Sequence, residues 1–213
     1  KELTKRIISS LILIPMVIFF ITGSSFLFIF FISICFLVTI YEWHKMTKKK
    51  FYYFFGFFFL LLSFYSAYAI RIKMFDGYDY FISILLICIS TDIGGYIFGK
   101  FFKGPKITKI SPKKTYSGVI GGYLFSIIFF NLLFSSTIFI TNPKELTSVI
   151  FIFILLISTV SQLGDITISY FKRLSKIKDT GKIIPGHGGL LDRIDGMIFA
   201  YPFAYLISKM DIF

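Results

Sequence analysis

Long apolar segments recur along this chain, and they limit what it can fold into. Seven of them are separated by short polar stretches, at 7–21, 26–41, 51–70, 80–98, 119–140, 146–170 and 196–208. A stretch of roughly 17 to 25 apolar residues crosses a hydrocarbon core of about 30 Å as a helix, whereas strands of a membrane barrel alternate apolar and polar residues. Hydrophobic residues make up 56% of the 213 residues, which argues against a soluble domain. The sequence therefore predicts an all-α, polytopic transmembrane protein with about seven spans, of which the last is short.

The basic residues predict how these spans are oriented. Short cytoplasmic loops are enriched in Lys and Arg, and 19 of the 23 basic residues fall on one side if the spans alternate from the N-terminus. The other four are Arg71, Lys73, Lys144 and Lys209. We therefore expect a cytoplasmic N-terminus, and the net charge of +12 describes one membrane face and does not indicate a nucleic-acid partner. An alternative for the first segment is a signal peptide that is cleaved near 23–25.

Five acidic residues lie in or beside the two long basic segments: Asp92, Asp165, Asp179, Asp192 and Asp195. A carboxylate at membrane depth is costly, so it usually faces a cavity, a cation or a basic partner. Asp192 and Asp195 are three residues apart and share a helical face if a helix begins near Leu191. A few such carboxylates are enough for Mg²⁺, which also keeps waters and substrate phosphates in its shell. The competing interpretation is a structural salt bridge, which is strongest for Asp179 beside Lys178.

Basic and glycine-rich motifs surround these carboxylates. They are SPKKT at 111–115, Lys172 with Arg173, and the glycines that flank His187 between 181 and 189. Glycines let backbone N–H groups approach phosphate oxygens closely, while Lys and Arg neutralise the phosphate charge. The bias of basic residues to the cytoplasmic side is an alternative explanation, and we prefer it for 48–50 and Lys103.

A longer motif is similar to that of a known family. Residues 169–195, SYFKRLSKIKDTGKIIPGHGGLLDRID, resemble the signature of phosphatidate cytidylyltransferases, the CDP-diacylglycerol synthase family. Supporting blocks are Asp92 with the glycines after it, SPKKT, and Gly164 with Asp165, so that the resemblance covers about 91–201. Many members have Glu before the signature Ser, where this chain has Ile168, so a carboxylate cannot be required there for activity. We divide the chain accordingly into N-terminal helices (1–90) and a catalytic region (91–213).

The resemblance implies an enzyme that condenses CTP with phosphatidic acid, giving CDP-diacylglycerol and pyrophosphate. It implies a Mg²⁺-containing two-cation centre held by Asp165, Asp192 and Asp195, with a second cation such as K⁺ left open. Lys172, Arg173 and His187 would join these three as catalytic residues. The residues implied in substrate binding are Asp92, Ser111, Lys113, Lys114, Thr115, Ser169, Lys178, Asp179, Gly188, Gly189 and Arg193. No protein nucleophile is needed, because the lipid phosphate is already ionised and the protein supplies positioning and charge.

Three alternatives stay open at this point. A CTP-dependent lipid kinase and a synthase that acts on an ether-linked lipid resemble this family more weakly in the lysine and glycine segments. A cation-coupled transporter would use Asp92 and Asp165 for its ion, but transporters place such residues near the bilayer midplane in broken helices. We expect an integral protein of a bacterial inner membrane with its site facing the cytoplasm, and we leave the choice between monomer and homodimer open.

Overall fold

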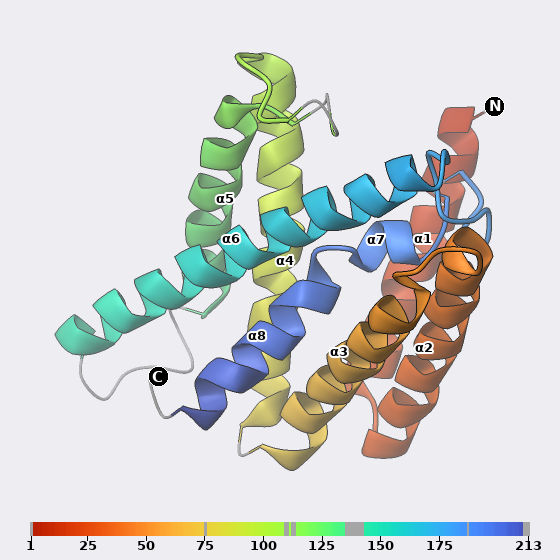
Figure 1. Cartoon of the computed structure of the whole chain (residues 1–213). Helices are drawn as coiled ribbons and strands as arrows, with labels where there is room; N and C mark the ends of the chain where they lie inside the picture. Colours follow the sequence, from red (N-terminus) through yellow and green to blue (C-terminus); the bar gives the residue numbers. More distant parts are fainter. Residues whose placement is uncertain are drawn as a thin grey trace.

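The computed structural model describes residues 2–74, 76–108, 111, 114–134, 143–186 and 188–210, and within these ranges the chain forms helices and turns without a β-strand (Figure 1). The helices are α1 (Glu2–Thr22), α2 (Ser25–Thr47), α3 (Tyr53–Lys73), α4 (Gly77–Phe101), α5 (Tyr116–Phe134), α6 (Pro143–Leu174), α7 (Leu191–Ile194) and α8 (Met197–Lys209). The prediction of an all-α protein is confirmed.

Five of the described helices are long and apolar enough to cross a membrane, namely α2 to α6. The apolar part of α1 is shorter, at Leu11–Thr22. Helix α8 has 13 residues and is therefore about 20 Å long, less than the thickness of a hydrocarbon core. Each predicted segment thus overlaps a helix, although residues 135–140 of the segment 119–140 lie outside the described residues. Among the described residues, length and composition support five spans, and the count of seven stays a prediction.

Helices α2 and α6 run furthest past the C-terminal ends of the segments that the sequence predicted, and both extensions carry polar residues. Helix α2 begins after Ser24, whose side chain accepts a hydrogen bond from the Leu27 N–H, and runs six residues past the predicted end at Tyr41. Glu42 and Trp43 are buried in this extension. Helix α6 has 32 residues and continues to Leu174, so that one helix carries Asp165, Ser169 and Lys172.

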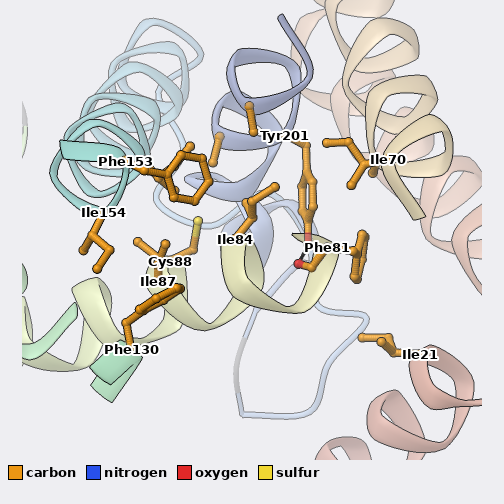
Figure 2. Packing of buried hydrophobic residues seen from close by; sticks show 14 of the residues in the cluster. Ile21, Ile70, Phe81, Ile84, Ile87, Cys88, Phe130, Phe153, Ile154 and Tyr201 are labelled. Carbon is orange, nitrogen blue, oxygen red and sulfur yellow. Dashed lines mark hydrogen bonds between the residues drawn. The ribbon is translucent and has the colours of Figure 1, made fainter. Parts of the chain in front are cut away.

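The main apolar core lies between α3, α4, α6 and α8 and also includes Ile21 of α1, Phe28 of α2 and Phe130 of α5 (Figure 2). Ile84 and Ile87 of α4 are fully buried in the same cluster as Ile154 of α6. The rings of Phe81 and Tyr201 stack with centroids 4.8 Å apart, which joins α4 to α8. This core fixes the helices whose ends carry the polar motifs.

Helices α4 and α5 pack closely because glycines face each other across their interface. A Cβ atom on Gly94 would overlap the carbonyl oxygen of Gly121, and one on Gly118 would lie 2.8 Å from the carbonyl oxygen of Gly95. Small residues allow such close approach between membrane helices. The close pair holds Asp92, one turn from Gly95, beside the start of α5.

A second apolar cluster lies beneath the signature loop, the segment 175–190 that joins α6 to α7. Its buried members include Trp43, Leu60, Ile168 and Leu191. The indole N–H of Trp43 donates to the backbone carbonyl of Tyr53 at 3.0 Å and so ties α2 to α3. Ile168 therefore has a packing role here, and the expectation that activity needs no carboxylate at this position stays a prediction.

Aromatic rings lie against three basic side chains at the end of the helices that is opposite the signature loop. Arg71 lies over the ring of Tyr78, with its guanidinium carbon 4.7 Å from the ring centroid, and Lys73 and Lys209 lie over tyrosine rings of their own helices. Tyr is enriched at membrane–water interfaces, and a cation over an aromatic face is attracted to it. These contacts mark the ends of α3 and α8, which lie at the bottom of Figure 1, away from the C-terminal end of α4.

Candidate active site

A pocket of about 360 Å³ opens where α4, α5, α6 and α7 converge. Its wall is formed by Thr91, Asp92, Gly95, Tyr96, Ile107, Lys114, Thr115, Gly118, Val119, Gln162, Asp165, Lys172, Asp179, Asp192, Arg193 and Asp195. Acidic and basic side chains from α4, α6, α7 and the segments that connect the helices thus share one cavity, and α5 contributes Gly118 and Val119.

One ion pair joins the start of α5 to α6. Lys114 Nζ lies 2.5 Å from Oδ2 of Asp165 and also donates to the carbonyl oxygen of Gln162 at 3.1 Å. The next residue, Thr115, accepts a hydrogen bond from the Gly118 N–H at 3.2 Å, which is the usual N-cap arrangement of a helix. The cap sets where α5 begins, and Lys114 therefore points from the helix start into the pocket.

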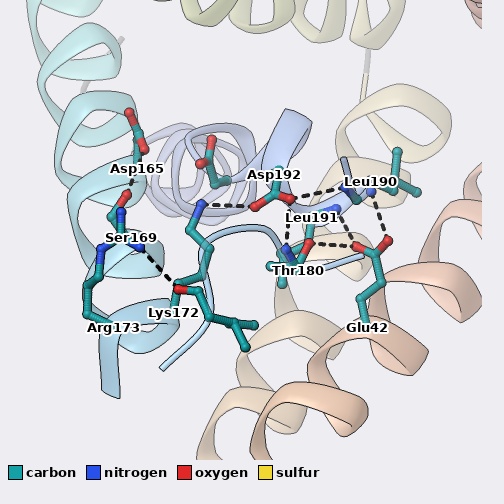
Figure 3. Close-up of polar contacts among 12 residues, drawn as sticks. Glu42, Asp165, Ser169, Lys172, Arg173, Thr180, Leu190, Leu191 and Asp192 are labelled. Carbon is teal, nitrogen blue, oxygen red and sulfur yellow. Dashed lines mark hydrogen bonds and ion pairs between the residues drawn. The ribbon is translucent and has the colours of Figure 1, made fainter. Parts of the chain in front are cut away.

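A second ion pair joins α6 to α7. Lys172 Nζ donates to Oδ1 of Asp192 at 2.9 Å, and Oδ2 of Asp192 accepts the N–H groups of Thr180 and Gly189 at 2.8 and 3.0 Å (Figure 3). Burial alone would raise the pKa of Asp192, but Lys172 and the two backbone donors outweigh it and lower that pKa below its ordinary value. Asp192 is therefore held as a carboxylate.

The surroundings of Asp195 shift its pKa in the opposite direction to that of Asp192. Asp195 is buried, and burial together with the negative charges of Asp165 and Asp92 raises its pKa well above the ordinary value, against the smaller effect of Lys172. A cation bound between these carboxylates would relieve their repulsion, and oxygen ligands suit Mg²⁺. Within the described ranges, however, no three acidic, His or Cys side chains are already gathered as a metal-binding group.

The structure brings nine of the residues predicted from sequence into the pocket wall: Asp92, Lys114, Thr115, Asp165, Lys172, Asp179, Asp192, Arg193 and Asp195. Helix α7 begins at Leu191, as expected for the last two acids of this set. The residues were proposed from motifs up to about 100 positions apart, so their convergence supports treating the motifs as one site.

Other predicted residues lie next to the pocket and not in its wall. Arg173 is exposed and donates to the carbonyl oxygen of Ile177 at 3.1 Å, while Ser169 donates to Oδ1 of Asp165 at 3.3 Å. The backbone N–H of Ser111 donates to the hydroxyl of Thr108. The remaining members of this group are the exposed Lys178 and the loop residues Gly188 and Gly189. Lys113 and His187 lie outside the described residues.

Sequence reasoning missed one acidic residue near this site. Glu42 of α2 is 1% exposed, and its carboxylate contacts the signature loop and the first residue of α7. The available signal was its position directly after an apolar segment, where an acid at membrane depth usually has a specific partner. Gln162, which lines the pocket, carried no comparable signal.

Comparison with known proteins identifies the family of the chain. The model of the cytidylyltransferase family matches residues 50–211. A phosphatidate cytidylyltransferase of Rickettsia conorii is 33% identical over 208 residues, which cover 95% of this chain and 90% of that protein. The protein of the same name from Rickettsia bellii is 42% identical over 132 residues, covering 60% of this chain and 57% of that protein. The one from Brucella suis is 36% identical over 135 residues, covering 63% and 48%.

The apolar helices and these matches define the class first, a helical membrane protein that is similar to nucleotidyltransferases. The chain belongs to the cytidylyltransferase family. The resemblance predicted from the signature is confirmed, and it reaches further toward the N-terminus than the motifs indicated, because the family match begins at residue 50. The chain spans most of the length of some of these relatives and about half the length of others.

Proposed function

We propose that this chain transfers the cytidylyl group of CTP to phosphatidic acid in the pocket between α4, α5, α6 and α7, giving CDP-diacylglycerol and pyrophosphate. The observation that carries the proposal is the meeting of two Lys–Asp pairs, Lys114 with Asp165 and Lys172 with Asp192, in the wall of one cavity. Two substrates that both carry phosphate need basic groups beside them, which Lys114 and Lys172 supply, and the acids of the same wall would hold the cations that neutralise the remaining phosphate charge. Membership of the cytidylyltransferase family and the common name of the relatives support the same reaction.

The chemistry needs little from the protein beyond placement and charge. An oxygen of the lipid phosphate attacks the α-phosphorus of CTP, a new P–O bond forms, and the bond to the β-phosphate breaks so that pyrophosphate leaves with its electron pair. Lys114, Lys172 and Arg193 lie where they can neutralise the substrates. The carboxylates of Asp165 and Asp192 hold the two ammonium groups in the pocket wall before a substrate arrives.

The pocket also fits the expected Mg²⁺. Asp165, Asp192 and Asp195 are the residues that would hold the ion, and the crowding of negative charge around the buried Asp195 favours a cation there. When bound, Mg²⁺ would neutralise negative charge on the triphosphate and on the leaving pyrophosphate. The second cation, such as K⁺, has no residues assigned to it and stays a prediction.

We further propose that the pocket faces the cytoplasm of a bacterial cell, at the inner membrane. The bias of basic residues toward one side supports this orientation, since the segments around Lys106 and Lys176 belong to the side that is rich in Lys and Arg. CTP then enters from water. The apolar part of the pocket wall, formed by Tyr96, Ile107 and Val119, is suited to the lipid substrate.

The test uses the purified full chain with CTP, phosphatidic acid and Mg²⁺, followed by lipid analysis and a pyrophosphate assay. We expect CDP-diacylglycerol and pyrophosphate in equal amounts. Asp165→Asn is the control, because it keeps the size of the side chain but removes the charge that pairs with Lys114. Folded wild-type protein that makes neither product, at any ratio of Mg²⁺ to CTP, would contradict the proposal.

A further inference from the structure

Glu42 presents a buried carboxylate outside the pocket wall. It lies in the last two turns of α2, and its three hydrogen-bond donors are all neutral. The hydroxyl of Thr180 donates to Oε2 at 3.0 Å, the Leu190 N–H to Oε1 at 3.0 Å and the Leu191 N–H to Oε2 at 2.8 Å (Figure 3). A buried carboxylate is costly unless such donors compensate it, so its position here calls for an explanation.

The signature loop is shaped around this carboxylate. A Cβ atom on Gly189 would lie 2.6 and 2.7 Å from the two oxygens of Glu42, and one on Gly181 would also overlap Oε1. Both distances are shorter than any ordinary contact of a Cβ atom. A side chain at Gly181 would therefore displace the carboxylate of Glu42, and one at Gly189 would displace both this carboxylate and the hydroxyl of Thr180 that donates to it.

The same loop carries the contacts that hold Asp192. Thr180 gives its hydroxyl to Glu42 and its backbone N–H to Asp192, while Gly189 gives its N–H to Asp192 one residue before Leu190 contacts Glu42. Asp192 in turn holds the ammonium of Lys172 in the pocket wall. An unbroken series of contacts therefore leads from Glu42 through the loop to two residues of the pocket.

We propose that Glu42 is a positioning residue for the cytidylyl transfer described above: it fixes the signature loop so that Asp192 and Lys172 face the substrates. The expected effect of Glu42 on the kinetics rests on the proposed function. Its effect on the position of the signature loop does not. Only a carboxylate satisfies the arrangement. A Gln side chain would turn one NH₂ group, which is a donor, toward donors of the loop.

The matched control lies one turn earlier on the same helix. Thr39 is as buried as Glu42, but its hydroxyl donates to the carbonyl oxygen of Cys35 within α2. Thr39→Val therefore perturbs the interior of α2 without touching the loop. On the loop side, Thr180→Val removes one donor to Glu42 at nearly constant volume, and Thr180→Ser retains it.

The experiment compares Glu42→Gln, Thr180→Val, Thr180→Ser and Thr39→Val in the full chain, with kcat, the KM for CTP and the Mg²⁺ concentration at half-maximal rate as readouts. Loss of a group that orients a metal ligand typically costs about 10- to 100-fold, and we expect Glu42→Gln to raise the Mg²⁺ requirement or the CTP KM by that factor. Thr180→Val should shift the same parameter less, and Thr180→Ser and Thr39→Val should stay within about twofold. In the double variant Glu42→Gln with Thr180→Val, the effects should combine to less than their product, because both act through one contact.

Hydrogen exchange at the Leu190 and Leu191 amides supplies a second readout that needs no activity. We expect faster exchange in Glu42→Gln than in wild type and Thr39→Val. Unchanged exchange, or Mg²⁺ and CTP parameters within twofold of wild type, would overturn the role of Glu42. If Thr39→Val changed the exchange rates and the kinetic parameters as much as Glu42→Gln does, the effect of Glu42 would be one of general packing and not of positioning the loop. If Glu42→Gln does not fold, the pair Thr180→Val and Thr180→Ser decides in the same way. Wild-type protein without activity would refute the proposed function, while the exchange rates would still test the loop.

Discussion

Lys172 Nζ and Asp192 Oδ1 lie 2.9 Å apart, and the two side chains are 10% and 5% exposed. The pair joins the C-terminal part of α6 to α7, whose Leu191 also belongs to the apolar cluster that contains Ile168 of α6. Removing one partner of a buried pair leaves an uncompensated charge, which typically costs about 3–5 kcal/mol. Asp192 retains two backbone donors when Lys172 is lost, so the cost here should fall at or below the lower end.

Lys172→Met tests this contribution to stability. We expect the free energy of unfolding in detergent to fall by about 2–3 kcal/mol, because Asp192 stays buried without its cation. Thermal or denaturant unfolding followed by circular dichroism measures it. Lys182→Met, at an exposed position of the same loop, should change stability by less than about 0.5 kcal/mol. Equal stabilities of the two variants would show that the pair contributes nothing.

The contribution of Asp192 to stability should depend on pH only at acidic pH. Its pKa in the folded protein is lowered from the ordinary 3.8, so the folded state favours the charged form and the unfolded state takes up the proton first. The stabilisation is fully present above 3.8 and is lost as the pH falls through the lower, folded-state pKa. With divalent cations chelated, the stability difference between wild type and Asp192→Asn should stay constant from neutral pH to about 5 and shrink only below 3.8. A difference that already shrinks between neutral pH and 5 would contradict the lowered pKa.

Asp165 and Asp179 should differ in their effect on turnover. Asp165 pairs with Lys114 inside the pocket and is a proposed Mg²⁺ ligand, whereas Asp179 is an exposed residue of the wall. We expect Asp165→Asn to lower kcat by at least about 100-fold and Asp179→Asn by less than about tenfold. Steady-state kinetics at saturating CTP measures both. Near-normal turnover of Asp165→Asn at limiting Mg²⁺ would rule out its role as a ligand.

The orientation in the membrane has a direct chemical test. Single cysteines replace Lys106 and Lys176 in a Cys35→Ser, Cys88→Ser background, and a third replaces Lys209. A membrane-impermeant thiol reagent should label the first two only from the cytoplasmic side and the third only from the opposite side, because basic loops stay in the cytoplasm. The reverse pattern would invert the proposed topology without affecting the pocket.

Hydrophobic pattern and motif chemistry were enough to predict the helices and most of the pocket, but not the partners of individual residues. Asp192 and Asp195 are similar in sequence context, yet one is paired with Lys172 and the other is buried beside Asp165. Which acid meets a base depends on how α6 and α7 pack, and no local pattern encodes that. The end of α2 is a second feature that depends on tertiary packing and that no local pattern predicts.

The predicted span in α2 stops at Tyr41 because Glu42 and the residues after it are polar. The helix continues because Trp43 and Met46 pack into the cluster beneath the signature loop. The burial of Glu42 follows from that tertiary packing, and it could be seen only once α2 and the loop were placed together.

The central claim is that the lipid phosphate attacks the α-phosphorus of CTP, and the position of the transferred phosphorus tests it most directly. The purified chain is given phosphatidic acid, Mg²⁺ and CTP labelled either at the α- or at the γ-phosphate, and the lipid is extracted and counted. We predict that α-label enters the lipid as CDP-diacylglycerol and that γ-label leaves in pyrophosphate, with both signals lost in Asp165→Asn. A lipid kinase would place γ-label in the lipid and leave α-label in water-soluble CDP, and that result would contradict cytidylyl transfer.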